Sequence, residues 1–313
     1  MKGRYKLQIL REDGSCRFES DWFDNLITNQ GLDQIGFNAS PMNAPFGAGY
    51  LNSVCSLGTS TTTPQYTDTQ LGAYGCASSP QNSGVWGATT AYNAGTTPYW
   101  SAIWTYTFST GVATGTWSEI GVGNWYHSAD TQPELFSHAL IVSGGSPTTI
   151  TVLSSESLIV TYELDYYINT TTNSYSMVIS TVTYSGSYLR ANITAAPQLF
   201  LGCGLSEFGN TSTYLNYYNG TIGTITGQPS GSGSSGPNNS TSGQPTPYTA
   251  GTYYNTFSNN VNIGQGNLSG GITAIEIVHS SQGSWQFSVS PAIPKTSSYQ
   301  LTINYSISWA RYP

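Results

Sequence analysis

Alternating apolar and polar residues open the chain and predict a β-hairpin over residues 4–19. Positions 5, 7 and 9 are apolar and their neighbours are charged or amide side chains, the period of a half-buried strand. The turn sequence Glu12-Asp13-Gly14 follows, and residues 16–19 return as a second strand. Residues 25–36 carry the best helix pattern, with Thr28 or Asn29 as cap and Leu32 and Ile35 on one face.

Almost every later pattern is typical of strands and turns. Residues 99–108 place five apolar side chains on one face: Trp100, Ala102, Trp104, Tyr106 and Phe108. Such an aromatic row could stack on sugars, but burial against a second sheet is the commoner role, and we predict a core strand. Residues 158–166 form another such strand, with the apolar face Leu158, Val160, Tyr162, Leu164 and Tyr166.

The strand at residues 158–166 has a counterpart at residues 301–309, where the order of apolar and aromatic residues recurs. A proline-started segment precedes each strand, at Pro147 and at Pro291, and a Glu-Ile pair lies upstream of each, at residues 119–120 and 276–277. The repetition predicts an all-β fold of two successive β-sandwich-like units, 1–168 and 169–313, related by duplication, with one short N-terminal helix. If Glu119 and Glu276 are buried, each needs a partner, and we expect a structural role for both.

Residues 227–251 are rich in Gly, Ser, Pro and Asn, so they cannot bury much apolar surface. We interpret them as a long exposed loop of the second unit, either functional or merely tolerated. Tyrosines flank this loop and form a candidate binding surface, since aromatic side chains suit stacking on glycans. They are Tyr214, Tyr217, Tyr218, Tyr253 and Tyr254.

Charge is scarce and unevenly placed. Charged residues make up 7% of the 313 residues, and the net charge is −7, which argues against binding a nucleic-acid backbone. Five of the eight basic residues lie in the first seventeen positions: Lys2, Arg4, Lys6, Arg11 and Arg17. They are candidates for anchoring the chain to an acidic protein partner; the alternative is a solvated edge strand guarded by its charges.

Targeting and metal signals are missing from the sequence. The first residues contain no apolar block typical of a signal peptide, and no apolar run is long enough to insert in a membrane. The cysteines, expected to be reduced and buried, have no metal-site spacing: Cys16, Cys55, Cys76 and Cys203. The Asn-x-Ser/Thr triplets are then products of composition.

Candidate catalytic groups are few. The histidines are His127, His138 and His279, and the pair Glu134 and His138 lacks a third ligand, so we predict no metal site. Glu163 and Asp165 share a strand face and could form a glycosidase pair, but a solvated strand surface is the simpler interpretation. Asp68 is expected to accept hydrogen bonds from nearby backbone amides. With no nucleophile, phosphate or dinucleotide motif, we predict a protein that is not an enzyme and binds no cofactor.

The order of these segments resembles the minor virion proteins of tailed bacteriophages, of the tail-tip, baseplate or tail-fibre type. The likeness covers mainly residues 1–168 and rests on the hairpin followed by four segments: residues 25–36, residues 55–64, Thr67-Asp-Thr-Gln-Leu71 and Ser118-Glu-Ile-Gly121. The resemblance implies a component of the virion, assembled in the bacterial cytoplasm, often a homotrimer, docked to other tail or virion proteins at its N-terminal side. Its distal β domain would face a host glycan or protein receptor, which would make the five tyrosines beside the loop at 227–251 its host-facing surface.

The leading hypothesis is therefore a non-enzymatic structural protein of a phage tail that contributes to assembly and host attachment. The alternatives are a capsid decoration or head-fibre protein, a glycan depolymerase, and a non-viral extracellular adhesin. Few ions need desolvation at the contacts of such a charge-poor surface, which favours assembly.

Overall fold

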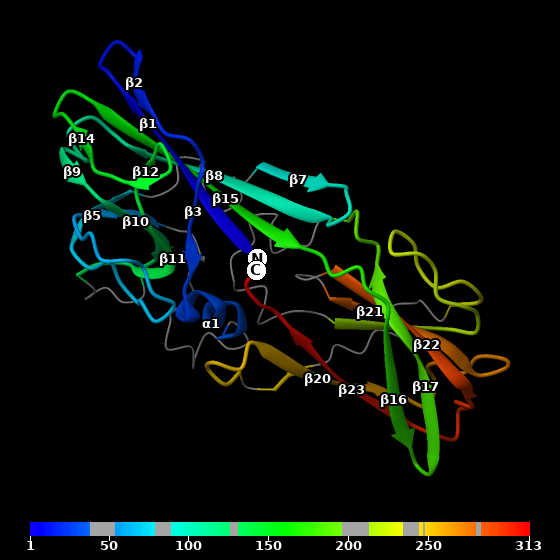
Figure 1. The fold of residues 1–313 in the computed structure, drawn as a ribbon. Coiled ribbons are helices and arrows are strands. Elements are labelled where there is room, and N and C mark those ends of the chain that lie inside the picture. Colours follow the sequence, from blue (N-terminus) through cyan, green and yellow to red (C-terminus); the bar gives the residue numbers. More distant parts are fainter. Residues whose placement is uncertain are drawn as a thin grey trace.

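The computed structural model describes residues 1–37, 54–78, 89–125, 131–195, 213–233, 244–246, 248–279 and 283–313. Strands hold 54% of the residues and helix 3%, which confirms the all-β prediction (Figure 1). Within these ranges no helix is long and apolar enough to cross a membrane.

Two sheets form the first unit. One has the strand order β2-β1-β15-β8-β7, with β3 also paired to β1; its strands are β1 (Lys2–Leu10), β2 (Cys16–Glu19), β3 (Phe23–Asp24), β7 (Thr89–Asn93), β8 (Tyr99–Phe108) and β15 (Ser157–Tyr167). The other has the order β4-β11-β10-β5-β6; its strands are β4 (Leu26–Ile27), β5 (Val54–Gly58), β6 (Tyr74–Ser78), β10 (Glu119–Asn124) and β11 (Glu134–Leu140). Two short pairs complete the unit: β9 (Gly115–Trp117) with β14 (Ile150–Val152), and β12 (Val142–Ser143) with β13 (Ser146–Pro147).

The second unit also has two sheets. The larger has the order β16-β17-β22-β21-β18, made of β16 (Asn173–Ile179), β17 (Val182–Ala191), β18 (Thr213–Tyr218), β21 (Ile272–His279) and β22 (Gly283–Ile293). The smaller has the order β19-β20-β23, made of β19 (Gln244–Pro245), β20 (Tyr254–Val261) and β23 (Leu301–Ser308). Neighbouring strands in both sheets pair in the antiparallel direction.

Strand connectivity repeats between the units. Strands β4, β5, β7, β8, β10, β11 and β15 have, in the same chain order, the counterparts β17, β18, β19, β20, β21, β22 and β23. In one sheet β4-β11-β10-β5 matches β17-β22-β21-β18, and in the other β7-β8-β15 matches β19-β20-β23. The two strands that were similar in sequence, β15 and β23, occupy equivalent places, as do the Glu-Ile strands β10 and β21. This agreement favours an origin by duplication.

Apolar positions on the central strands build the first core. The predicted face of β8 is buried along its whole length, and Leu158, Val160, Tyr162 and Leu164 of β15 are buried with it. The sugar-stacking alternative for β8 is therefore wrong, because its rings pack between the sheets. A second cluster forms inside the other unit around Leu215, Tyr217 and Ile275.

The N-terminal strand β1 is not an edge strand, which corrects the alternative interpretation of its charges. It pairs with β15 on one side and with β2 and β3 on the other, so it lies inside the sheet. The predicted hairpin with β2 is confirmed, and Cys16 on β2 is exposed, whereas Cys55 is buried as expected.

The helix α1 (Asn29–Phe37) starts directly after the predicted cap Thr28; the earlier part of the predicted range 25–36 is not helical, because Leu26–Ile27 pairs with β11 as β4. Thr28 is the cap: its hydroxyl accepts the N–H of Gly31 at 2.8 Å and donates to a β11 carbonyl. Leu32 and Ile35 are buried, as predicted, and the helix packs on β11. Gly31 is needed at this contact, since a Cβ there would lie 2.2 Å from the Phe136 carbonyl oxygen.

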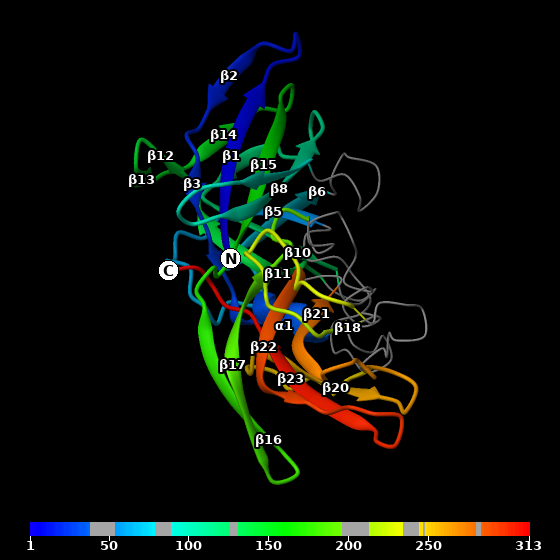
Figure 2. The same cartoon turned by 90° about the vertical axis from the view of Figure 1, so that its right-hand side faces the viewer.

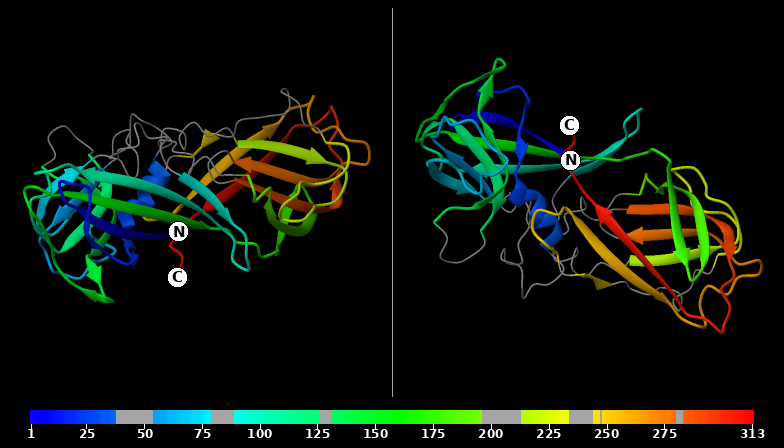
Figure 3. Two further views of the ribbon diagram at one scale, coloured as in Figure 1. Left: turned by 90° about the horizontal axis from the view of Figure 1, so that it is seen from above. Right: turned by 60° about the horizontal axis from the view of Figure 1, so that its bottom comes forward.

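The two units lie end to end, with both termini at the junction between them (Figures 1 and 2). Seen from above, the molecule is elongated (Figure 3), and the hairpin of β16 and β17 projects from the second unit away from the first (Figure 2). The junction is packed: Ile193 and Trp309 from the second half belong to the first core cluster, and Tyr248 packs against it.

The described residues of the loop at 227–251 are largely exposed, as the sequence predicted, but Tyr248 and Pro229 are not.

Candidate functional site

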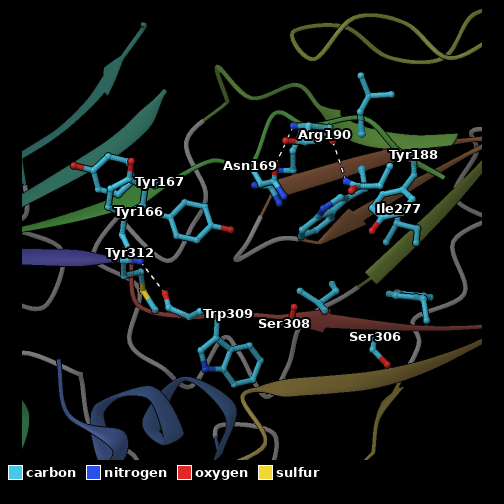
Figure 4. Close-up of a pocket in the computed structure, with 18 of the residues that line it drawn as sticks. Tyr166, Tyr167, Asn169, Tyr188, Arg190, Ile277, Ser306, Ser308, Trp309 and Tyr312 are labelled. Carbon is cyan, nitrogen blue, oxygen red and sulfur yellow. Dashed lines mark hydrogen bonds between the residues drawn. The ribbon is translucent and has the colours of Figure 1, made fainter. Parts of the chain in front are cut away.

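A cleft of about 520 Å³ lies at the junction, between the ends of strands from both units (Figure 4). The first unit contributes the end of β15 with Tyr166 and Tyr167. The second contributes β17, β22 and the whole C-terminal half of β23 together with the segment that follows it. The chain thus builds this cleft by bringing its last dozen residues back beside its first unit.

Aromatic rings form the walls of the cleft. Tyr167 stacks on Tyr312 with ring centroids 3.7 Å apart, and Tyr188 stacks on Phe287 at 5.2 Å. Trp285 lies behind them on β22, because alternation on this strand directs residues 285 and 287 to the same face. These rings offer flat apolar faces to a ligand.

Arg190 supplies positive charge to the cleft. Its guanidinium carbon lies 4.1 Å from the Trp285 ring centroid and 5.9 Å from that of Tyr166. Stacking on these rings fixes the plane of the guanidinium, and Arg190 is buried to 5% exposure. Asn169, Thr171, Asn173, Ser306 and Ser308 add amide and hydroxyl groups to the lining. None of the described lining residues is Asp or Glu.

Trp309 and Arg311 hold the C-terminal wall in place. The Trp309 indole N–H donates to the Leu32 carbonyl at 2.8 Å, and the Arg311 guanidinium donates to the Ile27 carbonyl and to Asn29 Oδ1. Two of these acceptors are backbone carbonyls and one is a side-chain amide oxygen, and all three belong to the first unit, so the wall is attached to both units.

The candidate anchoring residues do not form a free basic patch. Lys2 pairs with Asp24 at 2.9 Å, Arg4 with Glu163 at 2.7 Å, Lys6 with Glu19, and Arg17 with Glu156. Arg11 is exposed and donates to Ser15 Oγ at 3.1 Å. All five lie on the first hairpin, and most of their charge is matched by carboxylates of the same unit.

The tyrosines proposed as a host-facing surface are not brought together. Tyr217 and Tyr218 are buried, so their part of the prediction is wrong: Tyr217 packs in the core of the second unit, and Tyr218, on the opposite face of β18, donates its hydroxyl to Glu276. Tyr253 is half-buried and packs against the first core. Tyr214 and Tyr254 are exposed, but they belong to different sheets of the second unit.

Glu163 and Asp165 are buried, not solvated as the sequence interpretation held. Their strand lies between β1 and β8, and Arg4 on β1 donates to Glu163 through Nε and Nη2. Burial, and then the neighbouring Glu163 carboxylate, raise the pKa of Asp165 to about 6. Since Glu163 is held by Arg4 and neither carboxylate lines the cleft, the pair is part of the sheet and not of the site.

A raised carboxyl pKa lowers stability at neutral pH. The folded state binds the Asp165 proton more tightly than the unfolded chain, so the contribution of Asp165 to stability is highest below about pH 4 and is lost as pH rises towards 6. We expect Asp165→Asn to raise the free energy of unfolding by about 1–2 kcal/mol at pH 7.5 and to change it little at pH 3.5. Urea unfolding at both pH values tests this, with the exposed Asp21→Asn as control. An equal change at both pH values would contradict it.

Glu119 is buried, and it has the partners that a buried carboxylate needs. It accepts hydrogen bonds from the backbone N–H groups of Ser60, Gly72 and Ala73, and its Oε2 lies 3.0 Å from His138 Nε2. The other ring nitrogen of His138 lies 2.8 Å from Asp68. Both ring nitrogens of His138 therefore lie within hydrogen-bond distance of carboxylate oxygens.

Glu276, the counterpart of Glu119, is also buried. It accepts hydrogen bonds from the Asn216 amide and the Tyr218 hydroxyl, each at 3.0 Å. Asp68 accepts the N–H of Gln65, as predicted. His127 and Cys203 lie outside the described residues. In the described ranges, no cluster of His, Cys, Asp and Glu has the geometry of a metal site.

Sequence reasoning missed the cleft itself. Its aromatic residues come from four separated segments, which only the fold brings together. One signal was present: Arg190 is the first Lys or Arg after Arg17 in this charge-poor chain.

Comparison with known proteins gives no match to a family profile, to a curated protein or to a solved structure.

Proposed function

We propose that this chain is a non-enzymatic structural protein of a tailed-phage virion, a tail-tip, baseplate or tail-fibre component that assembles with neighbouring copies and proteins and contributes to host attachment. The observation that carries a binding role is the cleft at the junction, which offers aromatic faces, amides, hydroxyls and one stacked arginine. The assignment to a phage tail is supported by the resemblance of residues 1–168.

Self-assembly is supported by apolar side chains on the projecting hairpin. Val178 and Val182, on either side of its turn, are 67% and 44% exposed. Covering them with sister copies would bury this surface, and a homotrimer is the expected assembly. Light scattering of the purified chain measures the mass: three times 33.5 kDa supports this part of the proposal, and a monomer at high concentration contradicts it.

Location on the particle separates the hypotheses. Particles carrying a C-terminally tagged chain, labelled with gold and imaged by electron microscopy, should show label at the tail. Label on the capsid would instead identify a decoration or head-fibre protein. New reducing ends after incubation with host polysaccharide would overturn the non-enzymatic assignment.

Anchoring through the first hairpin needs a test that preserves the fold. Deleting residues 1–17 would remove β1 from the middle of its sheet, so the loss of incorporation would only report misfolding. Arg11 is exposed on this hairpin, and we expect Arg11→Glu to lower incorporation into particles about tenfold by repelling an acidic partner. Glu12→Gln, next to it in the turn, should incorporate normally. Normal incorporation of Arg11→Glu would remove the anchoring role.

A further inference from the structure

One strand of the first unit has no counterpart in the second. β1 pairs with β15 along nine residues, from Lys2 opposite Asp165 to Leu10 opposite Ser157. The strand equivalent to β15 is β23, which pairs with β20 on one side. Within the described part of the chain, no strand pairs with its other side. The second unit therefore has an open edge at the place that β1 fills in the first unit.

The register of β20 and β23 shows which backbone N–H and C=O groups face the open edge. The N–H of Trp309 donates to the carbonyl of Tyr253 at 3.0 Å, so alternate residues from Trp309 backwards bond to β20. The N–H and C=O groups of the residues between them face the open edge: Thr302, Asn304, Ser306 and Ser308. Their side chains are exposed, and β23 contains no charged residue and no proline, the features that usually protect an edge strand.

Two apolar residues in the middle of β23 are incompletely buried, although Leu301 and Ile307 are buried. Val160 and Tyr162 of β15 are 0% exposed, and the Tyr162 ring contacts that of Tyr5 on β1 at 5.0 Å. Their counterparts Ile303 and Tyr305 are only half-buried. The cleft runs along this part of β23, with Tyr305, Ser306, Ile307 and Ser308 in its lining (Figure 4). The free space thus lies where side chains of a further strand would pack.

We propose that the open edge of β23 binds an extended segment of another protein, which adds as an antiparallel strand and places alternate apolar side chains in the cleft. β1 shows the chemistry of such a segment, because its Tyr5, Leu7 and Ile9 point inward and its Lys and Arg side chains point outward. Main-chain hydrogen bonds would supply affinity, and the aromatic cleft would select the apolar side chains. The proposal identifies an extended peptide segment as the partner of the cleft. It rests on the proposed function only in assuming that the cleft binds a ligand.

A peptide with the sequence of residues 2–10, blocked at both ends, is the probe. Added to the full chain at up to 1 mM, it should slow amide hydrogen exchange at Thr302, Asn304, Ser306 and Ser308 at least tenfold, while residues already bonded to β20 change little. Unchanged exchange at these four amides would overturn the proposal. The experiment is done in solution without particles, so a negative result would not contradict the virion assignment. The imaging experiment tests that assignment separately.

N-methylated peptides provide matched controls that leave the protein unaltered. In the first unit, Gly3 and Leu7 carbonyls accept from residues on the β2–β3 side, so the amides of Arg4 and Lys6 face β15. Methylation at Arg4 and Lys6 should abolish binding, and methylation at Tyr5 and Leu7 should preserve the protection. Equal binding of both peptides would overturn strand addition. Concentration-dependent dimers that protect the same amides without peptide would assign the edge to a second copy and overturn the proposed partner.

Discussion

Replacing Glu119 by alanine is expected to lower the free energy of unfolding by about 3–5 kcal/mol, because it leaves a buried ionic network without its centre. Glu119 accepts three backbone N–H groups and faces His138. Without the carboxylate these donors have no partner, and each unsatisfied buried donor costs about 1–3 kcal/mol. The loops that carry the three amides would lose their common attachment to β10.

Urea unfolding at pH 7 measures this loss, with Glu12→Ala in the exposed turn as control. The isosteric Glu119→Gln keeps the volume but turns one acceptor into a donor facing N–H groups, so it should also destabilise the protein, by less than alanine does. An unfolding midpoint of Glu119→Ala equal to that of the wild type would show that the network contributes nothing.

Acid should remove the same stabilisation. Burial raises the pKa of Glu119, but the hydrogen bonds from His138 and the three backbone amides outweigh it, so the pKa lies below its ordinary value of 4.5. A lowered folded-state pKa stabilises the protein above pH 4.5, and this contribution is lost as pH falls through the folded-state value. The difference between wild type and Glu119→Gln should therefore narrow between pH 5 and pH 3.

Glu119 also shows what the sequence could predict. Its position before an apolar residue in a glycine-flanked strand, repeated at Glu276, indicated a structural role and the need for a partner if the carboxylate were buried. The partners could not be predicted, because Ser60, Gly72 and His138 come from segments that only the sheet order places together. Strand alternation likewise predicted the buried face of β8, since a two-residue period needs no knowledge of the neighbours.

Glu163 and Asp165 show where alternation fails. Charged residues on one face of a strand normally mark solvent, but here β1 supplies Arg4, which pairs with Glu163 and makes burial tolerable. The prediction for Tyr217 and Tyr218 was wrong for a related reason. Consecutive tyrosines beside a low-complexity segment are typical of a surface, whereas both rings are buried in the structure. The cleft lay beyond prediction because it forms between units whose relative placement depends on the last residues of the chain.

Trp309 is central to that placement. It is 7% exposed, belongs to the core cluster of the first unit, and stacks on Tyr248 with ring centroids 5.7 Å apart. Its indole N–H donates to the Leu32 carbonyl of α1 in the first unit. The residue that directly follows β23 therefore packs in the core of the other unit, and it also lines the cleft.

Replacing Trp309 by alanine is expected to cost about 3–5 kcal/mol, the usual loss for a buried tryptophan, and to uncouple the units. Calorimetry should then resolve two transitions where the wild type has one, since the first core would lose its contribution from the second half. The cleft should lose its wall in the same variant, so protection of the β23 amides by the peptide of residues 2–10 should fall. Trp309→Phe keeps a ring but loses the N–H donor, and should cost about 1–3 kcal/mol with one transition retained. Trp22→Ala, at an exposed tryptophan, is the control, and a single transition at the wild-type midpoint for Trp309→Ala would show that the units are joined by other contacts.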